Sequence, residues 1–270
     1  MKGTTLKISR ILTVATCAAL LAVGLPAAAN AATSVHEGDF TVPKGTTYVG
    51  DLRVHGDVVV GAGARVSGNL IVTGDVTLRG GSVVTQSVRV TDGAISIVRA
   101  TVVVDVRQTG AGGVAIYEGS EVRGDVSEQG TGNLSVNGHV RGAIAEADAG
   151  ALTVRGTVDG NVKEQGSGNV LVLGTVRGRV AEYDGGNLYV DKYVKGRTTD
   201  PTGTTGDVIE HDLGALVVHG RVNGTARELG GGSIGVGRTA VITGNVIESE
   251  DGDVVVSTGA TIGGEIRMTP

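Results

Sequence analysis

Apolar and polar residues alternate through nearly the whole chain beyond position 40, and the pattern has an 18-residue period. Leu52 and Val54, for example, recur as Leu70 and Val72. A period of two indicates β-strands that bury one face. The repeated apolar residues keep even numbers in both halves of the chain, with one slip near Ile95. Because a shift of one residue would turn every side chain over, the pattern predicts short strands in a constant register.

The second half of the chain repeats one 18-residue unit. Residues 124–142, 142–160 and 160–178 are three copies of it, and its leading glycine returns at positions 124, 142, 160, 178, 206, 224 and 244. The one long interval contains an insertion, residues 196–205. A short fixed period is typical of a solenoid, in which no single unit can bury its apolar face alone.

An 18-residue unit divides into three sides of about six residues each. We therefore predict an all-β protein, a single-stranded parallel β-helix of triangular section with coils stacked about 4.8 Å apart. Residues 32–270 have room for about a dozen such coils in one continuous domain. The 47 glycines suit tight corners and exclude long helices. With 1 Phe and no Trp, the core is predicted to consist of stacked Val, Leu and Ile.

Residues 1–31 have the features of a signal peptide. Lys2, Lys7 and Arg10 give a basic start. The apolar run 11–25 is followed by the cleavage motif Ala29-Asn30-Ala31. Cleavage near Ala31 predicts a secreted protein, extracellular or at the cell surface. No second apolar run is long enough to be a transmembrane segment.

The charge of the chain bears on its partners. It carries 28 acidic and 23 basic residues, a formal net charge of −5, and removal of residues 1–31 leaves −8. Nucleic acids attract basic surfaces through their phosphates. We therefore expect no nucleic acid partner.

Residues 50–84, GDLRVHGDVVVGAGARVSGNLIVTGDVTLRGGSVV, combine a Gly-x-Val-x-Gly cadence with two short motifs. Residues 60–68 have the form V-x-x-G-A-x-V-x-G, and residues 69–72 have the form [DN]-[LI]-x-V. In these features residues 42–90 resemble the bactofilin family. The resemblance implies a right-handed triangular β-helix that polymerises end to end without a nucleotide and serves as a scaffold. Bactofilins usually lack a signal peptide, so the resemblance here is to an exported form of such a protein.

The most regular charged feature is a glutamate at one place in every unit of the second half. These residues are Glu128, Glu146, Glu164, Glu182, Glu210, Glu228 and Glu248, and in three units an aspartate follows two positions later. A stack of carboxylates about 4.8 Å apart is unfavourable unless something offsets the repulsion.

Two interpretations of this acidic column are open. One is a Ca²⁺ site at an acidic corner, since Ca²⁺ prefers several oxygen ligands. Its candidate ligands are Glu146, Asp148, Glu182, Asp184, Glu210 and Asp212. The other is structural: each glutamate lies at or near a corner, where it accepts hydrogen bonds from the backbone amides of the following turn or stays solvated, because an unpaired buried carboxylate is very costly.

Tyrosines mark a second candidate site. Tyr183, Tyr189 and Tyr193 fall within one coil, just before the insertion 196–205. Aromatic rings form platforms for sugars, so this coil is the candidate site for a cell-wall or extracellular glycan. The sequence contains no Ser-His-Asp arrangement, phosphate-binding loop or zinc-ligand spacing, and we predict that the protein is not an enzyme.

These features predict a non-enzymatic exported structural protein, bactofilin-like or adhesin-like. It would act by end-to-end self-association or by contacts of its sides, because the first and last coils leave backbone groups unpaired. Two alternatives stay open: a glycan-binding or glycan-cleaving β-helix, and a calcium-stabilised surface rod. No cofactor other than Ca²⁺ in that alternative is expected.

Overall fold

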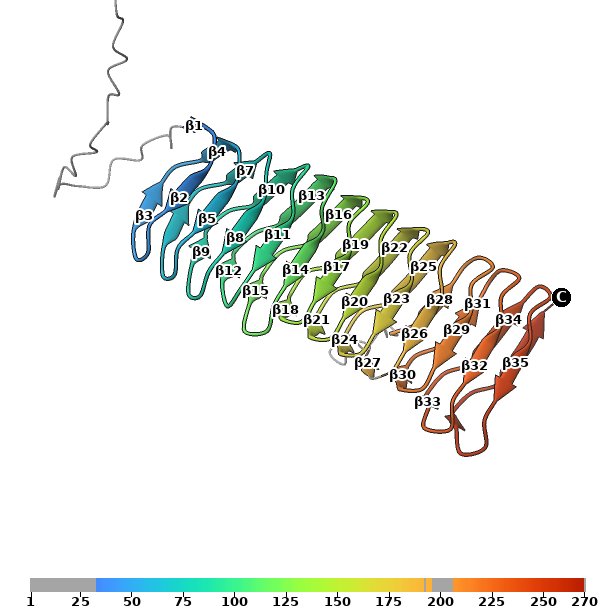
Figure 1. The fold of residues 1–270 in the computed structure, drawn as a ribbon. Coiled ribbons are helices and arrows are strands. Elements are labelled where there is room, and N and C mark those ends of the chain that lie inside the picture. The colour runs from blue at the N-terminus through green and yellow to red at the C-terminus, as the bar shows by residue number, and fades with distance from the viewer. Residues whose placement is uncertain (1–32, 192, 196–205, 270) are drawn as a thin grey trace, which may run out of the picture. The chain divides into compact units, whose positions relative to one another are not determined.

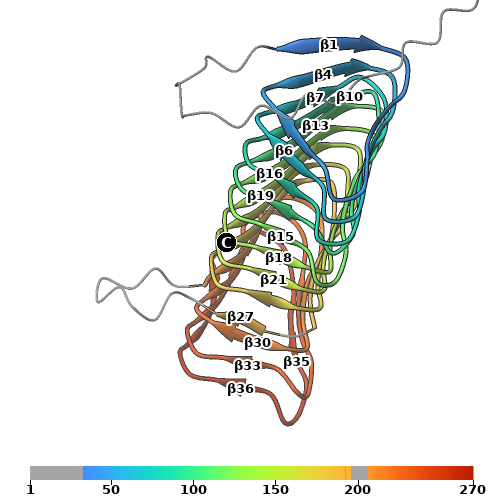
Figure 2. The same ribbon diagram turned by 90° about the vertical axis from the view of Figure 1, so that its left-hand side faces the viewer.

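The computed structural model describes residues 33–191, 193–195 and 206–269, and these residues form one parallel β-solenoid (Figure 1). Each coil contributes one strand to each of three sheets, so that the stack has three sides (Figure 2). The described residues contain no helix, and hence none that could span a membrane. The predicted all-β solenoid of about 12 coils is therefore confirmed. The predicted signal peptide 1–31 and the insertion 196–205 lie outside the described residues.

The three sheets follow the chain in rotation. Sheet A contains, in order, β1 (Ser34–Glu37), β4 (Leu52–His55), β7 (Leu70–Val72), β10 (Val88–Thr91), β13 (Val106–Gly110), β16 (Val126–Gly130), β19 (Ile144–Asp148), β22 (Val162–Gly166), β25 (Val180–Asp184), β28 (Val208–Glu210), β31 (Ala226–Glu228), β34 (Val246–Ser249) and β37 (Ile266–Thr269). Sheet B contains β2 (Phe40–Val42), β5 (Val58–Val60), β8 (Val76–Leu78), β11 (Ile95–Ile97), β14 (Val114–Ile116), β17 (Leu134–Val136), β20 (Leu152–Val154), β23 (Val170–Val172), β26 (Leu188–Val190), β29 (Leu216–Val218), β32 (Ile234–Val236) and β35 (Val254–Val256). Sheet C contains β3 (Thr47–Val49), β6 (Arg65–Ser67), β9 (Val83–Val84), β12 (Thr101–Val102), β15 (Glu121–Val122), β18 (His139–Val140), β21 (Thr157–Val158), β24 (Thr175–Val176), β27 (Tyr193–Lys195), β30 (Arg221–Asn223), β33 (Val241–Ile242) and β36 (Thr261–Ile262).

Stacked aliphatic side chains fill the interior between the sheets. Leu52, Leu70 and Val88 are partners in successive coils of sheet A and are fully buried. The same column arrangement holds in sheets B and C, which confirms the predicted core of Val, Leu and Ile. Identical register in coil after coil means that each new coil buries its apolar face on the one before.

The phase slip near Ile95 results from one residue that is added at one corner and removed at the next. The sequence offset between paired strands is one residue longer for β11 and β8 than for β12 and β9. Asp92 and Arg99 flank β11, and both have positive φ, 63° and 50°. These two left-handed residues reshape the corners. The inward direction of Ile95 and Ile97 is thereby preserved, and both are fully buried.

Side chains of Asp and Asn tie successive coils together at two corners. Asn161 Oδ1 accepts a hydrogen bond from the backbone N–H of Arg179, one coil later, at 2.9 Å. Asn169 Oδ1 accepts one from the N–H of Asn187 at 2.9 Å. Other acceptors of this kind are Asp39, Asp51, Asp57, Asn69, Asp75, Asp105, Asp125, Asn133, Asn187, Asp207 and Asn245. These bonds satisfy corner amides that the strand ladders leave over.

Candidate functional site

The glutamates of the repeated unit lie inside the solenoid. We call Glu128, Glu146, Glu164, Glu182, Glu210, Glu228 and Glu248 the glutamate ladder; all seven side chains are 0% exposed. They are register partners in consecutive strands of sheet A, from β16 to β34. Of the two structural alternatives, solvation of these side chains at a corner is therefore wrong. Their even numbering, shared with the buried valines, decides their direction.

The turn after each strand supplies hydrogen bonds to the ladder. Glu164 Oε1 accepts from the backbone N–H of Gly168 at 3.1 Å, and Glu182 Oε1 accepts from that of Gly186 at 2.9 Å. The same contact, four residues ahead, recurs at Glu128, Glu228 and Glu248. The predicted bond to the following turn is confirmed for these residues. The sequence signal that would have located the partner is Glu-x-x-x-Gly, which recurs in every unit.

The glycine of this motif is at a position with no room for a side chain. A Cβ at Gly168 would lie 1.5 Å from the carbonyl oxygen of Gly150 and 3.1 Å from Glu164 Oε1. The other members of this glycine column are equally confined by the glycine one coil before: Gly132, Gly150, Gly186, Gly214, Gly232 and Gly252. Only glycine brings the turn amide close enough to the buried carboxyl.

The second carboxyl oxygen of each ladder residue, Oε2, has no hydrogen-bond partner if all seven groups are ionised. Glu146 lacks a partner for both oxygens. Burial, with hydrogen bonds to the neighbouring glutamates, raises the pKa of Glu164 to about 9 and that of Glu210 to about 9. The same causes raise the pKa of Glu128 to about 8 and that of Glu248 to about 7. Burial also raises the pKa of Glu146.

At each end of the ladder, the next residue in register is not a glutamate. Gln108 is the register partner of Glu128 and is fully buried. Its Nε2 donates to the carbonyl oxygen of Ala111 at 3.0 Å, while its Oε1 is without a partner. At the other end, Glu248 pairs in register with Met268, which offers a thioether and no strong acceptor.

The predicted calcium ligands are divided between the inside and the outside of the solenoid. Glu146 and Glu182 are buried, whereas Asp148 and Asp184 are exposed at left-handed turns with φ of 85° and 87°. In the third pair Glu210 is buried and Asp212 is half-buried. Among the described residues, no group of three or more His, Cys, Asp and Glu is placed to hold a metal ion.

The three tyrosines of the predicted glycan site lie on three different sides. Tyr183 is in β25 of sheet A, Tyr189 in β26 of sheet B and Tyr193 in β27 of sheet C. Tyr183 stacks on His211, with ring centroids 4.1 Å apart, and Lys163 Nζ lies 5.0 Å from the Tyr183 ring centroid. The side chain of Tyr193 lies outside the described part of the chain. The structure therefore does not bring the three residues together in one platform.

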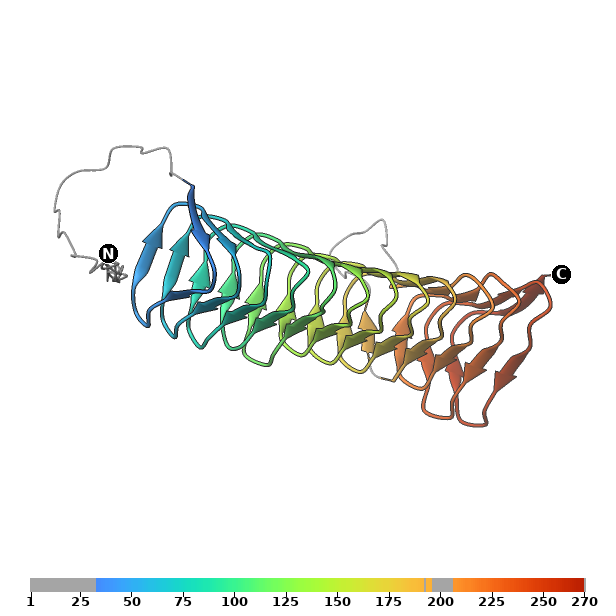
Figure 3. The same ribbon diagram turned by 45° about the horizontal axis from the view of Figure 1, so that its top comes forward.

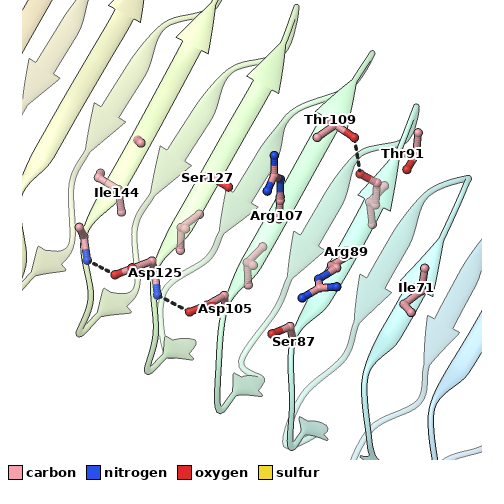
Figure 4. Close-up of a pocket in the computed structure, with 15 residues that line it drawn as sticks. Ile71, Ser87, Arg89, Thr91, Asp105, Arg107, Thr109, Asp125, Ser127 and Ile144 are labelled. Atoms are coloured by element: carbon pink, nitrogen blue, oxygen red, sulfur yellow. Dashed lines mark hydrogen bonds between the residues drawn. The ribbon is translucent and has the colours of Figure 1, made fainter.

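A hollow of about 710 Å³ lies instead on the outer face of sheet A, over β10, β13, β16 and β19 (Figure 4). Arg89 and Arg107 project from the adjacent strands β10 and β13. The small side chains of Ser127 and Ala145, on β16 and β19, also line the hollow. The Arg107 guanidinium donates to Gln129 Oε1 at 2.7 Å. Sequence analysis missed this hollow, although two arginines at the same place in successive repeats were a signal for it.

Sheet C carries ion pairs that run from coil to coil. Burial alone would raise the pKa of Glu121, but its carboxylate accepts hydrogen bonds from Arg123 in the same coil and from Arg141 in the next. These two contacts outweigh burial and lower the pKa of Glu121. Asp159 pairs with Arg177 and, at 3.0 Å, with His139 Nε2. These groups are partly exposed, so each pair contributes about 1 kcal/mol or less.

The first and last described coils lie at opposite ends of the stack (Figure 3). They differ in how far their core side chains are covered. In the first described coil, the Phe40 ring packs on the core between His36, with centroids 4.2 Å apart, and Tyr48, at 6.1 Å. In the last described coil, Ile266 and Met268 occupy core columns yet are 49% and 59% exposed. Among the described residues, no further strand packs on the core face of this coil.

Comparison with models of known protein families, with curated proteins and with solved structures found no match.

Proposed function

We propose that the protein is a non-enzymatic exported scaffold, bactofilin-like or adhesin-like in action, that joins to a second copy through its last coil. The observation that carries this proposal is the exposure of residues in core columns there. Val256 is 40% exposed, while its register partner Val236, one coil earlier, is 1% exposed. Strands β35, β36 and β37 are the last of their sheets among the described residues, so their outer edges offer unpaired N–H and C=O groups.

Apolar surface and free strand edges at one end favour the addition of another coil. The added coil would be held by apolar burial and strand pairing, as the coils within the chain are. The aromatic first coil offers a suitable counterpart, since Phe40 and Tyr48 present large apolar rings near the core columns. The signal-peptide features of residues 1–31 support export. A non-enzymatic role is supported by a sequence that contains no Ser-His-Asp arrangement, phosphate-binding loop or zinc-ligand spacing.

A matched pair of variants tests the proposal. Val256 faces the core column at the open end, whereas its neighbour Val255 points outward from sheet B and is 64% exposed. Val256→Lys should abolish assembly of residues 32–270 in light scattering and negative-stain electron microscopy. Val255→Lys should leave assembly intact. Wild-type protein that stays monomeric at all concentrations would overturn the proposal.

A second candidate function, glycan binding, is favoured by the hollow on sheet A. Its arginines and hydroxyl side chains suit a polyhydroxylated ligand, and coils about 4.8 Å apart offer repeated contacts along an extended chain. Arg89→Ala with Arg107→Ala should then weaken binding to a cell-wall polysaccharide. Arg53→Ala, on the same face but outside the hollow, should not. Equal binding by both variants would contradict this function.

A further inference from the structure

The glutamate ladder is a buried acidic column without a cationic partner among the described residues. No Lys or Arg there contributes to the environment of Glu128, Glu164 or Glu210. The interior side chains that sheets B and C pack against the ladder are aliphatic. The other titratable groups that face it from the corners are Asp148, Asp253 and His211. Two of these are acidic, so they add to the repulsion, and the desolvation of seven carboxylates would be prohibitive.

The unpartnered oxygens show what the column lacks. Every Oε2 of the ladder, and Gln108 Oε1 at its start, is a buried acceptor without a donor. A proton on a carboxyl converts that group into a donor, and the neighbours are close enough to use it: Glu146 is within hydrogen-bonding reach of both Glu128 and Glu164. Protons on alternate members would therefore satisfy acceptors and remove charge at the same time.

From this geometry we infer that the ladder is a proton-sharing column in which carboxylic acids alternate with carboxylates, and that loss of these protons at alkaline pH loosens the coils that contain it. The acids are Glu128, Glu164, Glu210 and Glu248, which alternate along the ladder with its other members, beginning with Glu146 as the acceptor. Glu146 fits the acceptor role especially well, because neither of its oxygens is used by a turn amide. The raised pKa values of Glu128, Glu164 and Glu210 agree with this assignment.

The inference is independent of the proposed scaffold function, and the chain contains its own control. The column that holds glutamate in the second half holds Val54, Val72 and Val90 in the first. These early coils have the same backbone arrangement but no buried carboxyl in this column. Alkaline loosening should therefore stop at Gln108.

Infrared spectroscopy of the unmodified protein is the first test. At about pH 6 we expect the C=O stretch of about four protonated carboxyls per chain, and its loss as the pH rises through about 9. Glu164→Gln should remove part of the band, whereas Glu118→Gln, at an exposed position, should leave it unchanged. A folded protein without this band would overturn the inference. So would a stoichiometric metal ion that copurifies and is needed for the fold.

Hydrogen exchange supplies the second test. After correction for intrinsic rates, protection of Val162–Gly166 should fall by about tenfold or more between about pH 7 and pH 10. Protection of Leu52–His55 should not change. Equal loss in both segments would show that alkali acts on the whole solenoid and would contradict a device located in the ladder.

Discussion

Gln108 and Glu128 are register partners one coil apart, so the ladder of buried carboxyls begins beside a side-chain amide rather than at solvent. An amide cannot ionise, yet it has the same length as glutamate and offers an acceptor. Gln108 is thus a neutral end for the column, placed between the aliphatic coils before it and the acidic coils after it.

The pH dependence of stability follows from the raised pKa values. Glu164 titrates at its ordinary value of 4.5 when unfolded and at about 9 when folded, so the folded chain binds more protons between these values. The free energy of unfolding should therefore fall as the pH rises from about 4.5 to about 9. Denaturant unfolding at a series of pH values measures this slope. Glu164→Gln should flatten it and Glu118→Gln should not; a slope of opposite sign would contradict the assignment.

The glycine column predicts a sharp contrast between two Gly→Ala variants. Gly168→Ala places a methyl group 1.5 Å from the Gly150 carbonyl oxygen, which should destabilise the chain by about 3 kcal/mol or more. Gly80→Ala meets nothing within 4 Å and should change stability by less than about 0.5 kcal/mol. Chemical denaturation of both variants provides the comparison. Similar values would mean that the turn can move away at little cost.

The corner hydrogen bonds predict a small but specific effect. Asn161→Ala leaves the N–H of Arg179 without its acceptor and should cost about 1 kcal/mol. Asn161→Asp keeps an oxygen at the same place and should be close to wild type. If Asn161→Ala and Asn161→Asp have the same Tm, the hydrogen bond makes no net contribution to stability.

Calcium removal should have little effect on stability. Glu182 is buried on a turn amide while Asp184 is exposed, so the two carboxylates are not positioned as a pair. We expect a chelator to change Tm by less than about 2 °C, which is under about 1 kcal/mol for a chain of this size. A large decrease that Glu182→Gln with Asp184→Asn abolishes would instead support the calcium-stabilised alternative.

The sequence predicts the fold well because every coil of a solenoid has the same spacing of apolar and polar residues. The 18-residue period, the inward valines and the bond from Glu164 to its turn all follow from spacing and parity. Burial of the glutamates does not follow in the same way, because a single buried carboxylate is very costly. Only carboxyl groups that are neighbours in a stack can lower that cost by sharing protons. The tyrosines mislead for the opposite reason: residues four to ten positions apart in a three-sided coil face different directions.

The Asp and Asn corner contacts were also missed, although their positions repeat with the same period. Each contact joins one coil to the next, so it has meaning only once the register is known. Asn161 and Arg179 lie one full repeat apart and have no local relationship that a search for turn motifs would find.

The fixed offset between each glutamate and its glycine makes the unit interchangeable. At Gly150, Gly168 and Gly186 an added Cβ would meet the same two atoms, the carbonyl oxygen of the preceding glycine and Oε1 of the unit's own glutamate. A copied or deleted unit would therefore meet the same neighbours as before. A gain or loss of one repeat unit therefore alters the extent of the molecule by one coil, about 4.8 Å, without altering its section. The number of repeat units therefore sets the length of such a protein, and recombination between repeats can change that length in steps of one coil.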